Sequence, residues 1–159
     1  MRKFTLVWVV ISSLFLVACS SLPESVRLDS HHKNTTYQNA ISPAMTGHWV
    51  SWQGQIAKVT NEKAETRLDI VYQNLDEQGQ PQNDSSPGRF VAVVNQFLDP
   101  MVYKPGRTIA VKGIIRHSIG ILVGQAHLQA PVIDVKAFYL WPKVKSVNNP
   151  PVFCGPFWP

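Results

Sequence analysis

The chain has 159 residues, of which 45% are hydrophobic, and a formal charge of +5 from 15 Lys and Arg against 10 Asp and Glu. Arg2 and Lys3 precede an apolar amino-terminal run, so the remainder carries only +3, spread without a block of like charges. This balance gives no reason to expect nucleic acid as a partner. The length after the run fits one domain with one core.

The amino-terminal run extends from Phe4 to Val17 and is followed at once by Ser20, Ser21 and Pro23. A helix that crosses a bilayer needs about 20 apolar residues, and this run is shorter. A short basic stretch followed by such a run is typical of an export signal. We therefore predict a signal peptide at residues 1–18. An ordinary signal peptide with an incidental cysteine, and a signal anchor that is never cut, stay open as alternatives.

The signal ends in Leu16-Val17-Ala18-Cys19, which resembles the lipobox of bacterial lipoproteins. The resemblance implies that Cys19 is the lipid attachment site and becomes the first residue of the mature chain. One acyl chain holds a protein only marginally, and several hold it firmly. Ser20, where retained lipoproteins carry aspartate, implies sorting to the outer membrane. The expected partner of the chain is therefore a membrane, reached through the lipid.

Residues 19–46 are rich in Ser, Asn and Thr and show no sustained hydrophobic period. Such a composition is typical of a flexible segment without its own core. We predict a disordered, lipidated tether over residues 19–46, which spaces the folded domain from the membrane.

Residues 47–142 show the alternation with period two that predicts half-buried strands. The first strand places Val50, Trp52, Gly54 and Ile56 on one face, and the second does so with Leu68, Ile70 and Tyr72. Phe90 to Val94 is a continuous, β-branched apolar run, which predicts a strand buried on both faces. A polar loop, Glu77 to Gly88, precedes it.

The second half of this region predicts three more strands. Arg107 opens one with Ile109, Val111, Gly113 and Ile115 on one face, and Ser118 to Gly120 predicts a tight return into a strand over Ile121 to Leu128. A last strand follows Pro131 and runs to Trp141. Only Phe97 to Tyr103 is compatible with a helical turn, which Pro100 keeps short.

Six short strands with glycines inside two of them, Gly54 and Gly113, indicate an all-β fold, because an interior glycine lets a strand coil sharply. We predict a small OB-like barrel of five or six strands over residues 47–142. A β-sandwich of similar size is the alternative.

Several motifs resemble those of the Slp family of outer-membrane lipoproteins, also called the starvation-inducible lipoprotein family. They are Trp52-Gln53-Gly54-Gln55-Ile56, Phe97-Leu98-Asp99-Pro100, Tyr103-Lys104-Pro105-Gly106-Arg107, Val111-Lys112-Gly113 and Tyr139-Leu140-Trp141-Pro142. Gln53 stands where the family usually has a second glycine. The resemblance implies an envelope protein linked to starvation or acid stress, without an established catalytic activity.

The histidines lack the spacing of a zinc site, and a single cysteine is left once Cys19 carries lipid. They are His31, His32, His48, His117 and His127. His117 and His127 are the one pair placed to face each other across a hairpin. We predict no metal site and no cofactor other than the covalent lipid.

No catalytic residue is predicted, and the chain is not expected to be an enzyme. Asp99 before Pro100 is typical of a turn-starting aspartate. Asp134 and Lys136 lie on one strand face, where a cross-strand ion pair is expected. Ser118 has no glycine-framed nucleophile elbow around it.

The aromatic residues of the strands are predicted to fill the core, with base or sugar stacking as the alternative. They are Trp49, Trp52, Tyr72, Phe138 and Tyr139. The tail, residues 143–159, is rich in proline and aromatic residues and predicts an irregular segment that either folds back on the barrel or meets a partner. We expect it to dock and to shield the thiol of Cys154.

Two classes of function therefore stay open. The first, which we prefer, is a non-enzymatic lipoprotein of the outer membrane, facing the periplasm and acting through envelope or protein contacts. The alternative is a periplasmic binding module that takes a small molecule, a glycan or a cation in the mouth of the barrel.

Overall fold

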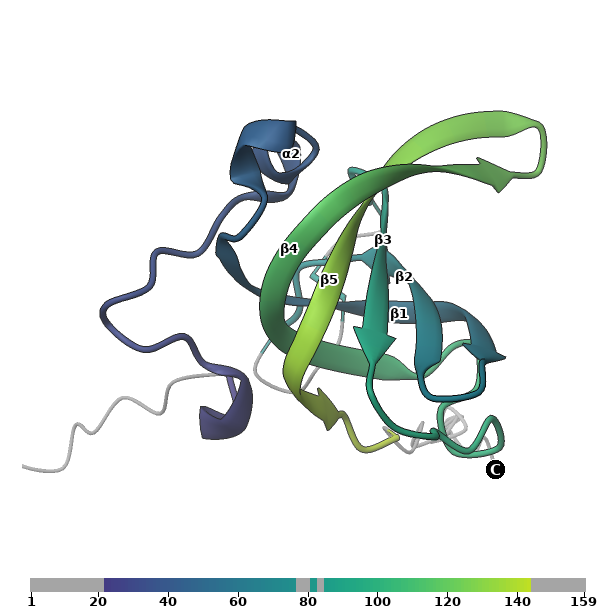
Figure 1. The fold of residues 1–159 in the computed structure, drawn as a ribbon. Helices are drawn as coiled ribbons and strands as arrows, with labels where there is room; N and C mark the ends of the chain where they lie inside the picture. The colour runs from purple at the N-terminus through teal and green to yellow at the C-terminus, as the bar shows by residue number, and fades with distance from the viewer. Residues whose placement is uncertain (1–21, 77–80, 83–84, 144–159) are drawn as a thin grey trace, which may run out of the picture.

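The structure is a computed structural model that describes residues 22–76, 81–82 and 85–143. Its strands close into a barrel in the order β1-β2-β3-β5-β4 (Figure 1). They are β1 (Trp49–Asn61), β2 (Thr66–Tyr72), β3 (Arg89–Val94), β4 (Thr108–Val123) and β5 (Ala126–Leu140). All neighbours are antiparallel except β3 and β5, which are parallel. The predicted OB-like barrel is confirmed with five strands, and the β-sandwich alternative is wrong because β1 and β4 close the sheet on itself.

The predicted inward faces form the core. Val50, Trp52 and Ile56 of β1 are buried and alternate with partly exposed neighbours. In β3 every residue from Phe90 to Val94 is buried, as the unbroken apolar run predicted. Phe90, Ala92 and Val94 belong to the barrel core, and a second cluster forms where Val91 and Val93 meet side chains of β4 and β5.

Gly54 and Gly113 lie where two backbones approach most closely. A Cβ atom at Gly54 would overlap the carbonyl oxygen of Val71, and one at Gly113 would overlap that of Asp134. The pairing of β1 and of β4 also shifts register close to these glycines. Both positions therefore allow the strands to coil into a closed barrel, as their place inside strands predicted.

The prediction of a separate strand over Ile121 to Leu128 is wrong, because this segment is divided between the end of β4 and the start of β5. Ser118 and Gly120 form no return but continue β4, opposite Pro131 and Gln129 of β5. The strands turn instead at Gly124, whose φ of +60° suits a residue without a side chain. Serine and glycine at positions 118–120 are compatible with an exposed strand as well as with a turn. The result is a long ribbon, residues 116–131, that projects from the barrel and is here called the hairpin arm (Figure 1).

Helical structure lies in the leader rather than after β3. The helical segments of the described chain are η2 (Glu24–Val26), α2 (Tyr37–Ala40) and η3 (Pro43–Met45). In the described parts of the chain, no helix has the length and apolar character needed to cross a membrane. Residues 99–103 form one hydrogen-bonded turn, in which the N–H groups of Val102 and Tyr103 donate to the Asp99 carbonyl.

Part of the predicted tether packs on the barrel. Val26, Tyr37 and Ala40 are buried, and the last two belong to the barrel core. The N–H of Thr35 also donates to the carbonyl of Trp49, which joins the leader to the start of β1. Residues 22–46 thus differ from the loosely packed spacer expected from their composition, because a few apolar side chains are enough to hold them against the barrel.

Candidate functional site

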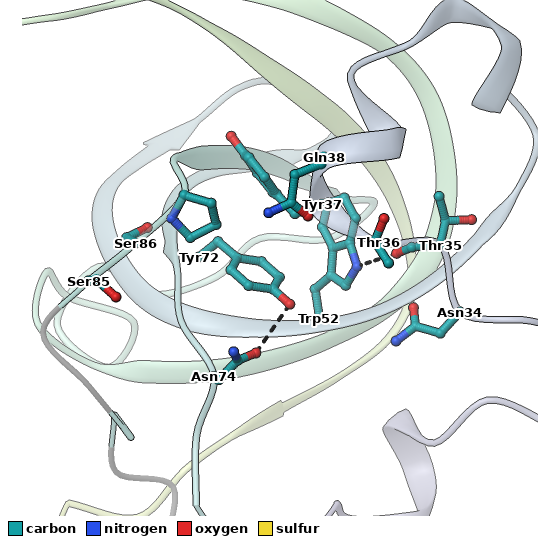
Figure 2. Close-up of a pocket in the computed structure, with 11 residues that line it drawn as sticks. Asn34, Thr35, Thr36, Tyr37, Gln38, Trp52, Tyr72, Asn74, Ser85 and Ser86 are labelled. Atoms are coloured by element: carbon teal, nitrogen blue, oxygen red, sulfur yellow. Dashed lines mark hydrogen bonds between the residues drawn. The ribbon is translucent and has the colours of Figure 1, made fainter.

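A hollow of about 510 Å³ opens between the leader and the mouth of the barrel (Figure 2). Residues 34–38 of the leader form one wall, and residues 85–87, just before β3, form another. Trp52, Tyr72 and Asn74 complete the lining. Tyr37 and Ala40 of α2 (Tyr37–Ala40) belong to the barrel core, so the leader covers this part of the core while the hollow stays open beside it.

The aromatic residues of the hollow are mainly core residues. Trp52 is only 2% exposed and Tyr37 only 4%. The Trp52 ring meets Tyr72 and Phe90 edge to face, with centroids 5.7 and 5.4 Å away, geometries that aromatic pairs prefer. Only Tyr72 is half-buried and keeps ring surface toward the hollow. For Trp52 the core interpretation is therefore supported over stacking on a ligand.

The other strand aromatics are partly buried and each contacts a second ring, and Phe138 also packs against the barrel core. Trp49 lies 4.9 Å from the His32 ring of the leader. Phe138 meets Tyr103 at 5.9 Å and Tyr139 meets Trp141 at 5.4 Å, both edge to face. These contacts fasten the leader and the loop after β3 to the barrel.

The polar groups around the hollow hold the leader in place. The indole N–H of Trp52 donates to the Thr35 carbonyl at 2.9 Å, and the Tyr37 hydroxyl donates to the Arg89 carbonyl at 2.9 Å. Asn34 donates to the Ser51 carbonyl and accepts from its N–H. The Tyr72 hydroxyl donates to the side chain of Asn74 (Figure 2).

The hollow is electrically neutral. Burial raises the pKa of Tyr37 and also the pKa of Tyr72. Both phenols therefore keep their protons at neutral pH, and no charged side chain occurs among the described residues that line the hollow. Among its described lining residues there is no His, Asp, Glu or Lys that could act as the base of a nucleophile, the pairing that covalent catalysis uses.

The histidines do not come together. His117 lies opposite Val132 and His127 opposite Leu122, so these two histidines do not face each other, because the turn lies at Gly124 instead of residues 118–120. In the part of the chain that the structure describes, no three His, Cys, Asp or Glu side chains are grouped to hold a metal ion.

Two further candidates have structural roles. The Asp99 carboxylate accepts the N–H of Met101 at 2.8 Å, which confirms the turn-starting aspartate. The Ser118 hydroxyl donates to the carbonyl of Ile41 at 3.3 Å and so links the hairpin arm to the leader.

Asp134 lies between two cations. Arg116, across the strand pair, approaches it at 3.1 Å, and Lys136 on the same strand at 2.7 Å. The expected cross-strand ion pair is present, with Arg116 as the partner across the strands. Burial tends to raise the pKa of Asp134, but the hydrogen bonds and charges of Lys136 and Arg116 outweigh it and hold the pKa below its usual range.

A lowered pKa makes this pair a pH-dependent stabilising contact. Its contribution is present above the unfolded aspartate pKa of about 3.9 and is lost as the pH falls through the lower folded value. We expect Asp134→Asn to lower the free energy of unfolding by about 1 kcal/mol or less at pH 7, since the partners are partly exposed. The difference from wild type should shrink in urea melts near pH 3. Asp29→Asn, at an exposed leader residue, is the control, and a difference that grows in acid would contradict the assignment.

The leader residues of the hollow were missed by the sequence analysis. Tyr37 is the one large aromatic residue in a polar stretch, and Asn34 and Thr35 precede it. A single aromatic residue gives no periodicity, so only its isolation in a polar segment signals a docking side chain. Cys19, the signal peptide and residues 144–159 of the tail, with Cys154, lie outside the described residues.

The sequence model of the Outer membrane lipoprotein Slp family matches residues 16–159, and the chain belongs to that family. Membership places it among the lipoproteins of the outer membrane.

Two curated relatives come from Escherichia coli (strain K12). "Uncharacterized lipoprotein YeaY" is 27% identical over 142 residues, covering 87% of this chain and 73% of the relative. "Outer membrane protein Slp" is 23% identical over 155 residues, covering 92% and 82%. The chain is similar to both along most of its length.

Solved structures with a similar fold include a small single-stranded DNA-binding protein from Streptomyces coelicolor, with a TM-score of 0.40 and 14% identity over 60% of this chain and 95% of that one. OBody AM3L09, bound to hen egg-white lysozyme, has a TM-score of 0.41 and 13% identity, covering 70% of this chain and 98% of that one.

Proposed function

We propose that the mature chain is attached to the outer membrane through lipid on Cys19, faces the periplasm and acts in starvation or stress through envelope or protein contacts rather than catalysis. The observation that carries this proposal is the family match, which begins at residue 16 and so includes the lipobox-like Leu16-Val17-Ala18-Cys19. The described residues that line the hollow include no His, Asp, Glu or Lys to activate a hydroxyl group, which supports the non-catalytic part.

The lipid would be the only group added to the chain, and its acyl chains would supply the membrane affinity. Each buried CH₂ contributes about 0.8 kcal/mol, so several chains anchor a small domain durably. Residues 1–18 would be removed with the signal.

Cys19→Ser is expected to abolish lipidation, because a serine hydroxyl cannot form the thioether to the lipid. Metabolic labelling with radioactive palmitate should mark the wild-type protein and not the variant, and the variant should keep the uncut precursor mass. Cys154→Ser is the matched control and should label like wild type. Label that persists in Cys19→Ser would overturn the attachment site.

Sorting of the lipoprotein to the outer membrane is tested separately at Ser20, the residue that follows Cys19. We expect the wild-type protein to fractionate with the outer membrane and Ser20→Asp to shift it toward the inner membrane. Wild-type protein in the inner membrane, unaffected by Ser20→Asp, would contradict the proposed location.

The hollow favours a second candidate function, a periplasmic binding module. Its neutral amides, hydroxyls and one half-exposed tyrosine ring match a glycan or a neutral small molecule better than a cation. Calorimetric titration with neutral mono- and disaccharides tests it, with Gln38→Ala and Asn74→Ala expected to weaken binding while the melting temperature stays unchanged. Wild-type protein that binds none of these saccharides would remove the glycan from consideration.

A further inference from the structure

The loop after β3, residues 97–106, has exposed apolar side chains, and its backbone is held in place at Leu98. Phe97 is 71% exposed, Met101 80% and Val102 45%. The frame between them is fixed, because Leu98 is buried, its N–H donates to the Thr66 hydroxyl at 3.0 Å and its carbonyl accepts from Asn61 at 3.2 Å. Because the backbone of this loop is held in place, these side chains do not fold back onto the barrel. Exposed apolar groups of this kind indicate a contact with a partner or a membrane.

A cationic pocket of about 320 Å³ adjoins this loop. Lys104, Arg107 and Lys143 line it, and no acidic side chain is among its described lining residues. The salt bridges of the described chain involve other groups. The Arg107 guanidinium donates to the carbonyls of Val102 and Trp141, at 3.2 and 2.9 Å, so one cation is fixed between the loop and the end of β5.

Trp141 lines the same pocket and leaves a hydrogen bond unmade. The residue is 7% exposed, and its indole N–H has no partner in the described part of the chain. That nitrogen is itself covered by the protein, so the donors of the pocket that can reach a ligand are those of the lysine and arginine side chains. Lysine and arginine are donors suited to the oxygens of a phosphate group.

The loop and the pocket lie at the end of the barrel where the chain would enter the membrane. In the view of Figure 1 the loop of residues 97–106 lies at the lower right and η2 at the lower left, while α2 and the tip of the hairpin arm lie at the top. η2 itself packs on the wall of the barrel, where the Val26 carbonyl accepts from the Ser51 hydroxyl and the Arg27 carbonyl from Lys112. Leu22, just before η2, is three residues from Cys19, a span of about 10 Å at most. A lipid on Cys19 would therefore bring this end of the barrel to the bilayer surface.

We propose that this end is a second membrane contact, in which Phe97, Met101 and Val102 enter the bilayer surface and the pocket of Lys104, Arg107 and Lys143 holds an anionic phospholipid head group. The inference rests on the proposed anchoring through Cys19. Apolar side chains beside basic ones are the composition that binds anionic membrane surfaces. The contact fixes the orientation of the domain, with the neutral hollow facing away from the membrane.

Photo-crosslinking of the full lipidated protein tests the contact. A photoreactive benzophenone amino acid replaces Phe97 or, as the control at the far end, Leu122, which is 63% exposed. The proteins are placed in vesicles of phosphatidylethanolamine with or without phosphatidylglycerol. We expect lipid adducts at position 97 to exceed those at 122 several-fold and to increase with phosphatidylglycerol. Lys104→Glu with Lys143→Glu should remove that increase, whereas Lys33→Glu should preserve it.

The mass of the amino-terminal peptide separates the two proposals. Acylated protein that gives equal adducts at 97 and 122, or adducts to a protein at 97 in whole cells, would overturn the membrane contact alone. A peptide without acyl chains would overturn the anchoring and the contact together. Inorganic phosphate should leave the adducts unchanged relative to chloride at equal ionic strength, and their selective loss in phosphate would point to a soluble anion instead.

Discussion

Trp52→Ala is expected to unfold the domain or nearly so. Trp52 is buried in the barrel among Tyr37, Tyr72 and Phe90, and its indole N–H fastens the leader through Thr35. Truncation of a buried tryptophan lowers the free energy of unfolding by about 3–5 kcal/mol, out of a total of about 5–15 kcal/mol for a typical domain. The loss of the Thr35 hydrogen bond adds to the effect.

Urea unfolding monitored by far-UV circular dichroism measures this change. The matched control is Phe97→Ala, because Phe97 is also aromatic but is 71% exposed, and substitutions at exposed sites usually stay within about 0.5 kcal/mol. A Trp52→Ala protein that keeps wild-type stability while it loses binding of a saccharide to the hollow would show that Trp52 belongs to a ligand site and not to the core.

Gly54→Ala and Gly113→Ala should each destabilise the barrel strongly. The added methyl group would overlap the backbone carbonyl of Val71 in the first case and of Asp134 in the second, and a backbone atom between paired strands cannot move aside without opening the sheet. Overpacking of this kind costs about 1–3 kcal/mol and sometimes more.

Gly120→Ala provides the internal control, since Gly120 lies in the exposed part of β4 and a Cβ atom there would meet nothing within 4 Å. Glycine in a strand is less favourable than alanine by about 0.5–1 kcal/mol, so this variant should be neutral or slightly more stable. Comparable thermal melting of all three variants would contradict the close approach at Gly54 and Gly113.

The inward faces of the strands could be predicted from the sequence, because successive side chains of a strand point to opposite faces and the buried face therefore carries every second residue. Val50, Trp52 and Ile56 alternate with polar neighbours, and the run from Phe90 to Val94 has no polar position at all. A strand that is covered on both faces needs such a run, so the burial of both faces of β3 was predictable too. The glycines inside two strands, Gly54 and Gly113, also predicted the coiling of these strands, because a missing side chain acts at its own position.

The features that were missed depend on contacts between distant parts of the chain. The parallel pairing of β3 with β5 has no local signal, and neither does the docking of Tyr37, whose neighbours are polar. Ser118 to Gly120 has the composition of a turn, yet these residues pair with residues 129–131 of β5 and so continue the strand. The candidate hollow was therefore predicted only as a barrel mouth, without the leader residues that form its wall.

Closure of the barrel by β1 and β4 has a consequence for the order of folding. Gln55 pairs with Thr108 and Trp49 with Ile114, so the closing contacts join residues 53 to 65 positions apart. Contacts of such sequence separation form slowly, because the intervening loop must first be ordered. In a chain that emerges amino terminus first, β1 and β2 can pair early, but the barrel stays open until β5, which lies between β3 and β4 and ends at Leu140, has emerged as well. Up to that point Trp52 and Phe90 remain accessible to solvent and to chaperones.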